Sequence, residues 1–131
     1  MTTSVDKRIL AKRYAKYITA WNKRDKQEQA EWLARAAQAE QAALSCAKLL
    51  ADEYRVRRVW LIGSLLHPKS FRQGSDIDLA VEGLAAREYF SALSKLYQIL
   101  PEGLKLDLIT IETAQPSLRK HIQTAGRILY E

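Results

Sequence analysis

Three short apolar runs in the second half of the chain constrain its fold most strongly. They occupy residues 59–62, 77–81 and 104–111, and glycine, proline or polar residues bound them. Short runs rich in valine, isoleucine and leucine are typical of buried strands. Between the second and third runs, residues 86–100 repeat apolar side chains at helical spacing until Pro101. This alternation of strands and helix predicts an α/β fold.

The predicted helix over 86–100 has one apolar face. We expect six of its side chains to point inward: Tyr89, Phe90, Leu93, Leu96, Tyr97 and Leu100. A last helix is expected to begin at Pro116, because proline is accepted in a first helical turn. Its apolar positions are Leu118, Ile122 and Leu129, so we expect it to run almost to residue 131.

The first half of the chain has a helical pattern. Residues 3–6 offer a capping box for a helix over 3–21, in which apolar residues recur at helical spacing over 10–21. Residues 27–54 are rich in alanine, glutamate and glutamine and contain no glycine or proline. The polar segment 22–26 separates them, so this half is either two helices or one helix that bends near Asn22. We therefore expect a helical arm or hairpin over 1–56, before a core over 57–131. Its small alanines allow packing against the core, against itself or against a second copy in a homo-oligomer.

The composition excludes several classes of protein. The chain has 131 residues, a size typical of one domain, and no apolar run is long enough to cross a membrane. Its N-terminus carries charges where a secretory signal needs an apolar stretch. Cys46 is the single cysteine, which excludes a disulfide framework and a cysteine-rich zinc site. We expect a cytoplasmic protein in which Cys46 is a small core residue.

The positive charge is concentrated at the N-terminus. The formal net charge is +6, and the first 26 residues hold eight lysines or arginines against two aspartates, so they carry the whole excess. Such an arm can meet nucleic acid or an acidic protein, or can simply be a solvated helix face. We favour the solvated face.

A set of acidic residues marks the candidate site. Asp76 and Asp78 flank Ile77 in the second predicted strand, and Asp107 lies in the third. Because residues i and i+2 of a strand face the same side, Asp76 and Asp78 project together. Their mutual repulsion and hard oxygen atoms suit Mg²⁺ bound together with substrate phosphates. Asp107 is a third carboxylate, able to ligate a second ion or to take a proton from an attacking hydroxyl.

A glycine turn lies upstream of the acidic pair. Gly63 and Ser64 follow the first predicted strand, and eleven residues separate Ser64 from Asp76. Glycine lets the backbone approach a ligand closely, and the N–H groups of such a turn can hold a phosphate. The residues between the turn and the carboxylates that are further candidates for nucleotide phosphates are Lys69, Arg72 and Ser75.

Together, these residues resemble a known family. The Gly63-Ser64 turn, the Asp76-Ile77-Asp78 pair and the later strand around Asp107 look like the polymerase β-like nucleotidyltransferase superfamily, and more narrowly like its minimal nucleotidyltransferases (MNT). The resemblance covers residues 57–131 and implies a short mixed sheet flanked by helices. It also implies a reaction in which Mg²⁺ at the three aspartates holds ATP or another nucleoside triphosphate and a nucleoside monophosphate passes to an acceptor hydroxyl.

The resemblance also suggests a partner. MNT proteins are often encoded beside a HEPN-domain protein, and several act as antitoxins by adenylylating it. Larger relatives carry a further domain for the acceptor, and a core of this length has no room for one, so the expected acceptor is a protein partner or a site completed by an oligomer.

The chain departs from its relatives in one loop. Many relatives have arginine and glycine soon after the Gly-Ser turn, whereas here Leu65, Leu66 and His67 follow it and Pro68 limits any helix that starts there. The alternative function is an inactive nucleotidyltransferase fold that binds protein or nucleic acid through the basic arm.

Overall fold

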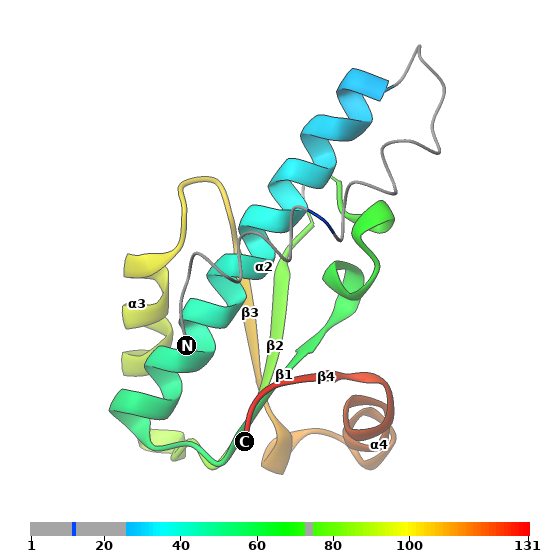
Figure 1. The fold of residues 1–131 in the computed structure, drawn as a ribbon. Coiled ribbons are helices and arrows are strands. Elements are labelled where there is room, and N and C mark those ends of the chain that lie inside the picture. Colours follow the sequence, from blue (N-terminus) through cyan, green and yellow to red (C-terminus); the bar gives the residue numbers. More distant parts are fainter. Residues whose placement is uncertain (1–11, 13–25, 73–74) are drawn as a thin grey trace.

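The computed structural model describes residue 12 and residues 26–72 and 75–131. These residues form a four-stranded sheet in the order β3-β2-β1-β4, with helices packed around it (Figure 1). The strands are β1 (Arg58–Ile62), β2 (Ile77–Glu82), β3 (Leu106–Thr110) and β4 (Arg127–Tyr130). Apart from residue 12, the predicted helix over 3–21 lies outside the described residues, as does nearly all of the basic segment over 1–26.

The sheet is mixed. β1 runs antiparallel to both β2 and β4, whereas β2 and β3 are parallel. The connection from β2 to β3 passes through α3 (Tyr89–Ile99), as a parallel pair requires. The expected α/β fold and the three expected strands are confirmed.

The fourth strand corrects the sequence prediction. The last helix, α4 (Pro116–Ala125), ends before Gly126, and residues 127–130 form β4 instead of continuing the helix. A Cβ atom on Gly126 would lie 2.5 Å from the carbonyl oxygen of Ile122. Glycine therefore lets the chain leave α4 closely packed and turn onto the edge of β1.

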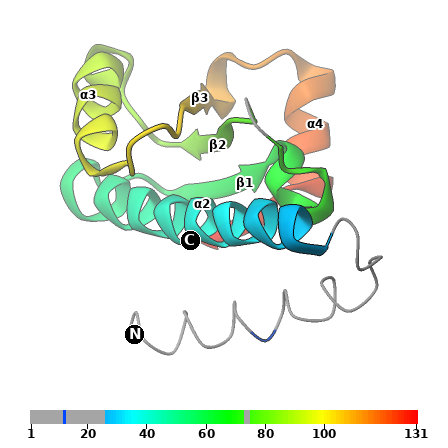
Figure 2. The ribbon, with the colours of Figure 1, turned by 90° about the horizontal axis from the view of Figure 1, so that it is seen from above.

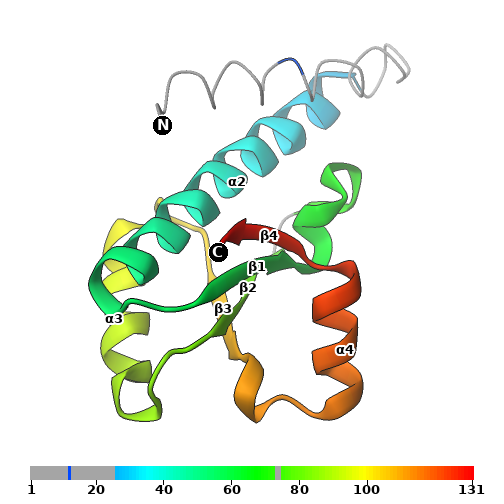
Figure 3. The same cartoon turned by 60° about the horizontal axis from the view of Figure 1, so that its bottom comes forward.

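One face of the sheet is covered by α2 (Lys26–Tyr54) and α3. Figure 2 shows α2 running along one side of the sheet, and Figure 3 shows α3 beside the C-terminal half of α2. The expected helix over 27–54 is thus confirmed. Most of the fully buried side chains that α2 contributes are small, which lets the helix approach the strands closely: Ala36, Ala39, Ala43 and Cys46, beside the larger Leu33 and Leu50. Burial raises the pKa of the Cys46 thiol to about 12, consistent with a core residue.

The opposite face of the sheet has a smaller apolar cluster. Trp60, Ile62 and Ala80 of the strands pack there with Ile122 of α4 and Ile111. Ile111 belongs to one of the short 3₁₀ segments, which are Gly63–Leu66, Pro68–Ser70, Ala86–Glu88 and Ile111–Thr113. Because this cluster is small, polar residues of β2 and β3 occupy part of the same face.

Helix α3 closes the outer edge of β3. The Tyr97 hydroxyl donates to the carbonyl oxygen of Leu106 and accepts from its N–H, both at 3.0 Å, and the Tyr89 hydroxyl donates to the carbonyl oxygen of Leu108 at 2.6 Å. These hydroxyls replace a neighbouring strand. The inward orientation predicted for Phe90 is wrong, because its side chain is 80% exposed, and Tyr97, though it reaches β3, is 44% exposed; only Leu96 among the predicted six is fully buried.

A buried ion pair joins α2 to β4. Glu40 is 3% exposed, and its Oε2 lies 2.7 Å from Nη2 of Arg127.

Among the described residues, none of the helices has the length and hydropathy needed to span a membrane.

Candidate active site

Strands β2 and β3 bring two of the predicted carboxylates side by side. The parallel register pairs Asp78 with Asp107, and Asp76 lies immediately before β2. Ile77, Leu79 and Val81 are fully buried, as the alternation of the strand predicts, so Asp78 projects from the other face of the sheet. That face carries the smaller apolar cluster, and neither α2 nor α3 covers it.

The three carboxylates interact electrostatically. The pKa of Asp78 is raised to about 6, first by burial and then by the negative charges of Asp107 and Asp76. A raised pKa means that the charged form of Asp78 is disfavoured in the folded protein. The site thus collects negative charge that a bound cation would neutralise.

Gly63 makes room for Asp78. It has a φ of +80°, a conformation that glycine adopts without strain, and a Cβ atom on it would lie 2.2 Å from Oδ2 of Asp78. The carboxylate therefore lies directly against the backbone of the turn, which follows from the pairing of Ile62 with Asp78. The sequence predicted a glycine that lets phosphate approach, and the structure adds a role in seating a carboxylate.

The candidate phosphate-binding residues fall into two groups. Gly63 and Ser64 begin the first 3₁₀ segment, where the N–H of His67 donates to the carbonyl oxygen of Ser64 at 3.0 Å. Pro68 opens the second 3₁₀ segment, and the side chain of Lys69 lies outside what the structure describes.

Arg72 and Ser75 form a turn of their own. The backbone N–H of Arg72 donates to Oγ of Ser75 at 3.0 Å, and the N–H of Ser75 donates to the carbonyl oxygen of Arg72 at 2.9 Å. The Arg72 guanidinium donates to the carbonyl oxygen of Phe71 at 2.8 Å. These hydrogen bonds join Arg72 and Ser75 just before Asp76.

A pocket of about 400 Å³ opens beside Asp76. Its lining brings together Arg72, Ser75 and Asp76 but includes none of Gly63, Ser64, Asp78 and Asp107. Sequence reasoning missed its other polar and aromatic lining residues, which are Trp32, Arg35 and Lys105. Of these three residues, only Trp32 and Arg35 could have been grouped from the sequence, because residues three apart lie on the same face of a helix.

The carboxylates suit a divalent cation that also binds substrate. Within residues 26–72 and 75–131, no group of three or more His, Cys, Asp or Glu side chains is arranged to enclose a metal ion. Mg²⁺ is commonly held by one or two carboxylates together with phosphates and water, so Asp78 and Asp107, with Asp76 nearby, fit such an ion.

Comparison with known proteins identifies the family. The family model described as "Polymerase beta, Nucleotidyltransferase" matches residues 45–131. Among solved structures, the toxin–antitoxin complex MntA-HepT contains a similar chain, with a TM-score of 0.52 and 24% sequence identity over 70% of this chain and 71% of that one. This likeness concerns the fold. No curated protein sequence matches significantly. The family model covers most of the chain, including β1 to β4, and the chain belongs to the polymerase β nucleotidyltransferase family.

Proposed function

We propose that the protein is a Mg²⁺-dependent nucleotidyltransferase that transfers AMP from ATP to a hydroxyl group on a protein partner. The observation that carries this proposal is the register of β2 and β3, which pairs Asp78 with Asp107 next to Asp76. Three interacting carboxylates on adjacent strands have a direct use in this chemistry, and their repulsion otherwise only costs stability.

Each carboxylate has a role in the proposed reaction. Asp76 and Asp78 would hold the metal ion, with Asp107 beside them. Mg²⁺ bound there would neutralise charge on the triphosphate. A carboxylate oxygen of Asp107 takes the proton of the acceptor hydroxyl. The hydroxyl oxygen then forms a bond to the α-phosphorus, and the bond from that phosphorus to the pyrophosphate oxygen breaks.

The turn and the following loop hold the nucleotide phosphates in this proposal. Gly63 and Ser64 supply backbone N–H groups and a hydroxyl, while Lys69, Arg72 and Ser75 supply further donors. Arg72 and Ser75 lie next to Asp76 in the structure, which supports their part. Gly63 has a second role, because its lack of a side chain leaves room for the carboxylate of Asp78.

The partner is proposed to be a HEPN-domain protein. One solved structure with a similar fold belongs to a toxin–antitoxin complex, MntA-HepT. By analogy, the present chain would act as an antitoxin that adenylylates its toxin.

The test is transfer of label from ATP labelled at the α-phosphate. The protein is incubated with Mg²⁺ and the HEPN-domain protein encoded beside it. Label should enter the partner only with Mg²⁺, and Asp78→Asn should lower the rate at least about 100-fold, within the range that a lost catalytic group costs. Asp52→Asn is the matched control, because Asp52 is exposed on α2 and pairs only with Lys48 in the described residues. Equal labelling by Asp78→Asn would contradict the proposal.

A further inference from the structure

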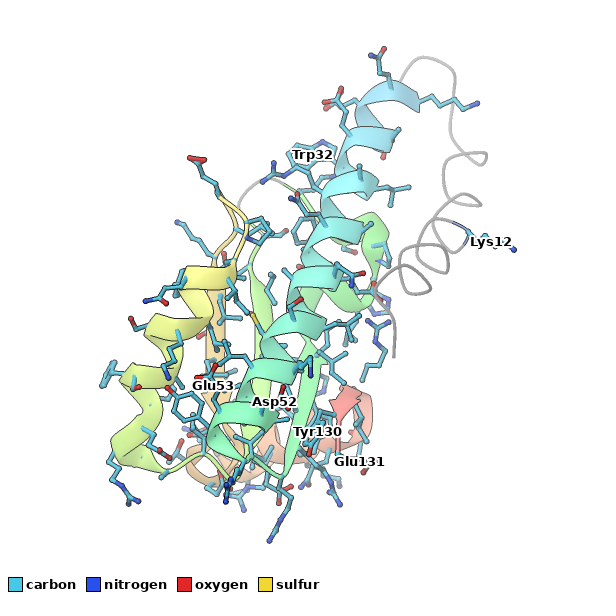
Figure 4. All side chains as sticks on the ribbon, turned by 60° about the vertical axis from the view of Figure 1, so that its left-hand side comes forward. Lys12, Trp32, Asp52, Glu53, Tyr130 and Glu131 are labelled. Carbon is cyan, nitrogen blue, oxygen red and sulfur yellow. The ribbon has the colours of Figure 1, made fainter. Side chains whose placement is uncertain are left out.

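The pocket beside Asp76 is separate from the pair formed by Asp78 and Asp107. It is bounded by the N-terminal half of α2, by the loop that leads into β3, and by Phe71, Arg72, Ser75 and Asp76. Figure 4 labels Trp32 near the N-terminal end of α2. Asp76 is the one residue of the acidic trio (Asp76, Asp78 and Asp107) that lines the pocket, so a ligand there would contact Asp76 and lie beside the other two carboxylates.

The pocket is positively charged. Arg35, Arg72 and Lys105 come from three different parts of the chain and outnumber the single carboxylate, Asp76. Arg35 extends toward the loop opposite, because a Cβ atom on Gly103 would lie 3.5 Å from its Nη2. Guanidinium groups bind phosphate through paired hydrogen bonds, and a lysine adds a point charge, so the lining favours an anion such as phosphate.

The pocket also offers an aromatic surface. Trp32 is half-buried and lies three residues before Arg35, so the two share one face of α2. Phe71 is 1% exposed and Leu104 is 7% exposed, and they form the apolar part of the lining. An indole beside several cations is the arrangement on which nucleobases stack while their phosphates are neutralised.

The size of the pocket matches one nucleotide. A volume of about 400 Å³ lies within the range of sites that take small organic ligands. We propose that this pocket binds a nucleoside phosphate without metal, as a second nucleotide site beside the one that the acidic trio would serve. The inference goes beyond the proposed function: the pocket shares Arg72, Ser75 and Asp76 with the proposed ATP site, but Trp32, Arg35 and Lys105 belong to the pocket, and Asp78 and Asp107 do not line it.

The direct test is calorimetric titration with AMP in the presence of EDTA. The wild-type protein should bind AMP, and Arg35→Glu and Lys105→Glu should each weaken binding at least tenfold. Lys120→Glu is the matched control, because it makes the same change of charge on an exposed residue of α4 and should bind AMP like the wild type. Adenosine and pyrophosphate should bind more weakly than AMP, since each lacks one half of the proposed ligand.

A second titration separates the two sites. With Mg²⁺ and a non-hydrolysable ATP analogue, Arg35→Glu and Lys105→Glu should keep the Mg²⁺-dependent binding event within about twofold of the wild type. If Arg35→Glu and Lys105→Glu lose the Mg²⁺-dependent binding together with AMP binding, the pocket holds the base of the ATP analogue itself, and the proposal of a second site is overturned. It would also be overturned if the wild type fails to bind AMP in EDTA or if both variants bind AMP normally. AMP binding in EDTA without any Mg²⁺-dependent event would support the second site and contradict the proposed function.

Discussion

Replacing Asp78 with asparagine should stabilise the metal-free protein. Burial and the charges of Asp107 and Asp76 raise the pKa of Asp78 from 3.8 to about 6, so its ionised form is disfavoured in the folded state. A shift of that size corresponds to about 3 kcal/mol if it acted in full. The site is only partly buried, and solvent screening lowers the expected gain to about 1 kcal/mol at pH 7.

The sign of the effect gives it a characteristic pH dependence. The folded protein binds the Asp78 proton more tightly than the unfolded chain does, so this group contributes stability below pH 3.8 that is lost as the pH rises through about 6. The difference in unfolding free energy between Asp78→Asn and the wild type should therefore grow from pH 4 to pH 7.

Urea denaturation at several pH values, with EDTA present, measures this difference. Asp52→Asn serves as the control, because Asp52 is exposed and its pair with Lys48 contributes at most about 0.5 kcal/mol. If Asp78→Asn is less stable than the wild type at pH 7, or if the difference does not change with pH, the reasoning about the acidic trio is refuted.

Two further substitutions test the local geometry. Gly63→Ala should destabilise the protein by at least about 1 kcal/mol more than Gly103→Ala, because both glycines have positive φ but only the Cβ at 63 would meet Asp78. Thermal denaturation measures both losses of stability, and equal losses would show that Asp78 does not lie against the turn. Tyr97→Phe should cost about 1 kcal/mol in urea denaturation, because it leaves the N–H and carbonyl of Leu106 to water at the edge of β3; an unchanged midpoint would show that α3 does not protect this edge.

The sequence predicted the strands that depend on local pattern. The strand that contains Asp78 was found as a short apolar run after a polar loop, and the period of two along a strand predicted that Asp78 lies opposite the buried Ile77 and Leu79. The strand over 127–130 was missed because four residues carry too little periodicity, and its conformation depends on pairing with β1. Phe90 was misplaced because the buried face of α3 is formed by Ala92 and Leu96, and Phe90 lies on another face of the helix and is exposed.

The candidate site was predictable only in part. The spacing from Gly63 to Asp76 and Asp78 lies within one local motif, so the sequence was enough to select it. The basic pocket depends on α2 crossing the sheet so that Trp32 comes near Lys105, residues that are far apart in the chain. No local pattern encodes that meeting, because tertiary packing alone produces it.

The most direct test of the central claim is calorimetric titration with a non-hydrolysable ATP analogue, with and without Mg²⁺. It compares the wild type with the double variant Asp76→Ala and Asp78→Ala. If the acidic trio is a nucleotidyltransferase site, Mg²⁺ will add a binding event in the wild type that the double variant lacks. If Mg²⁺ adds no binding to the wild type, or adds the same binding to both proteins, the assignment of these aspartates is wrong.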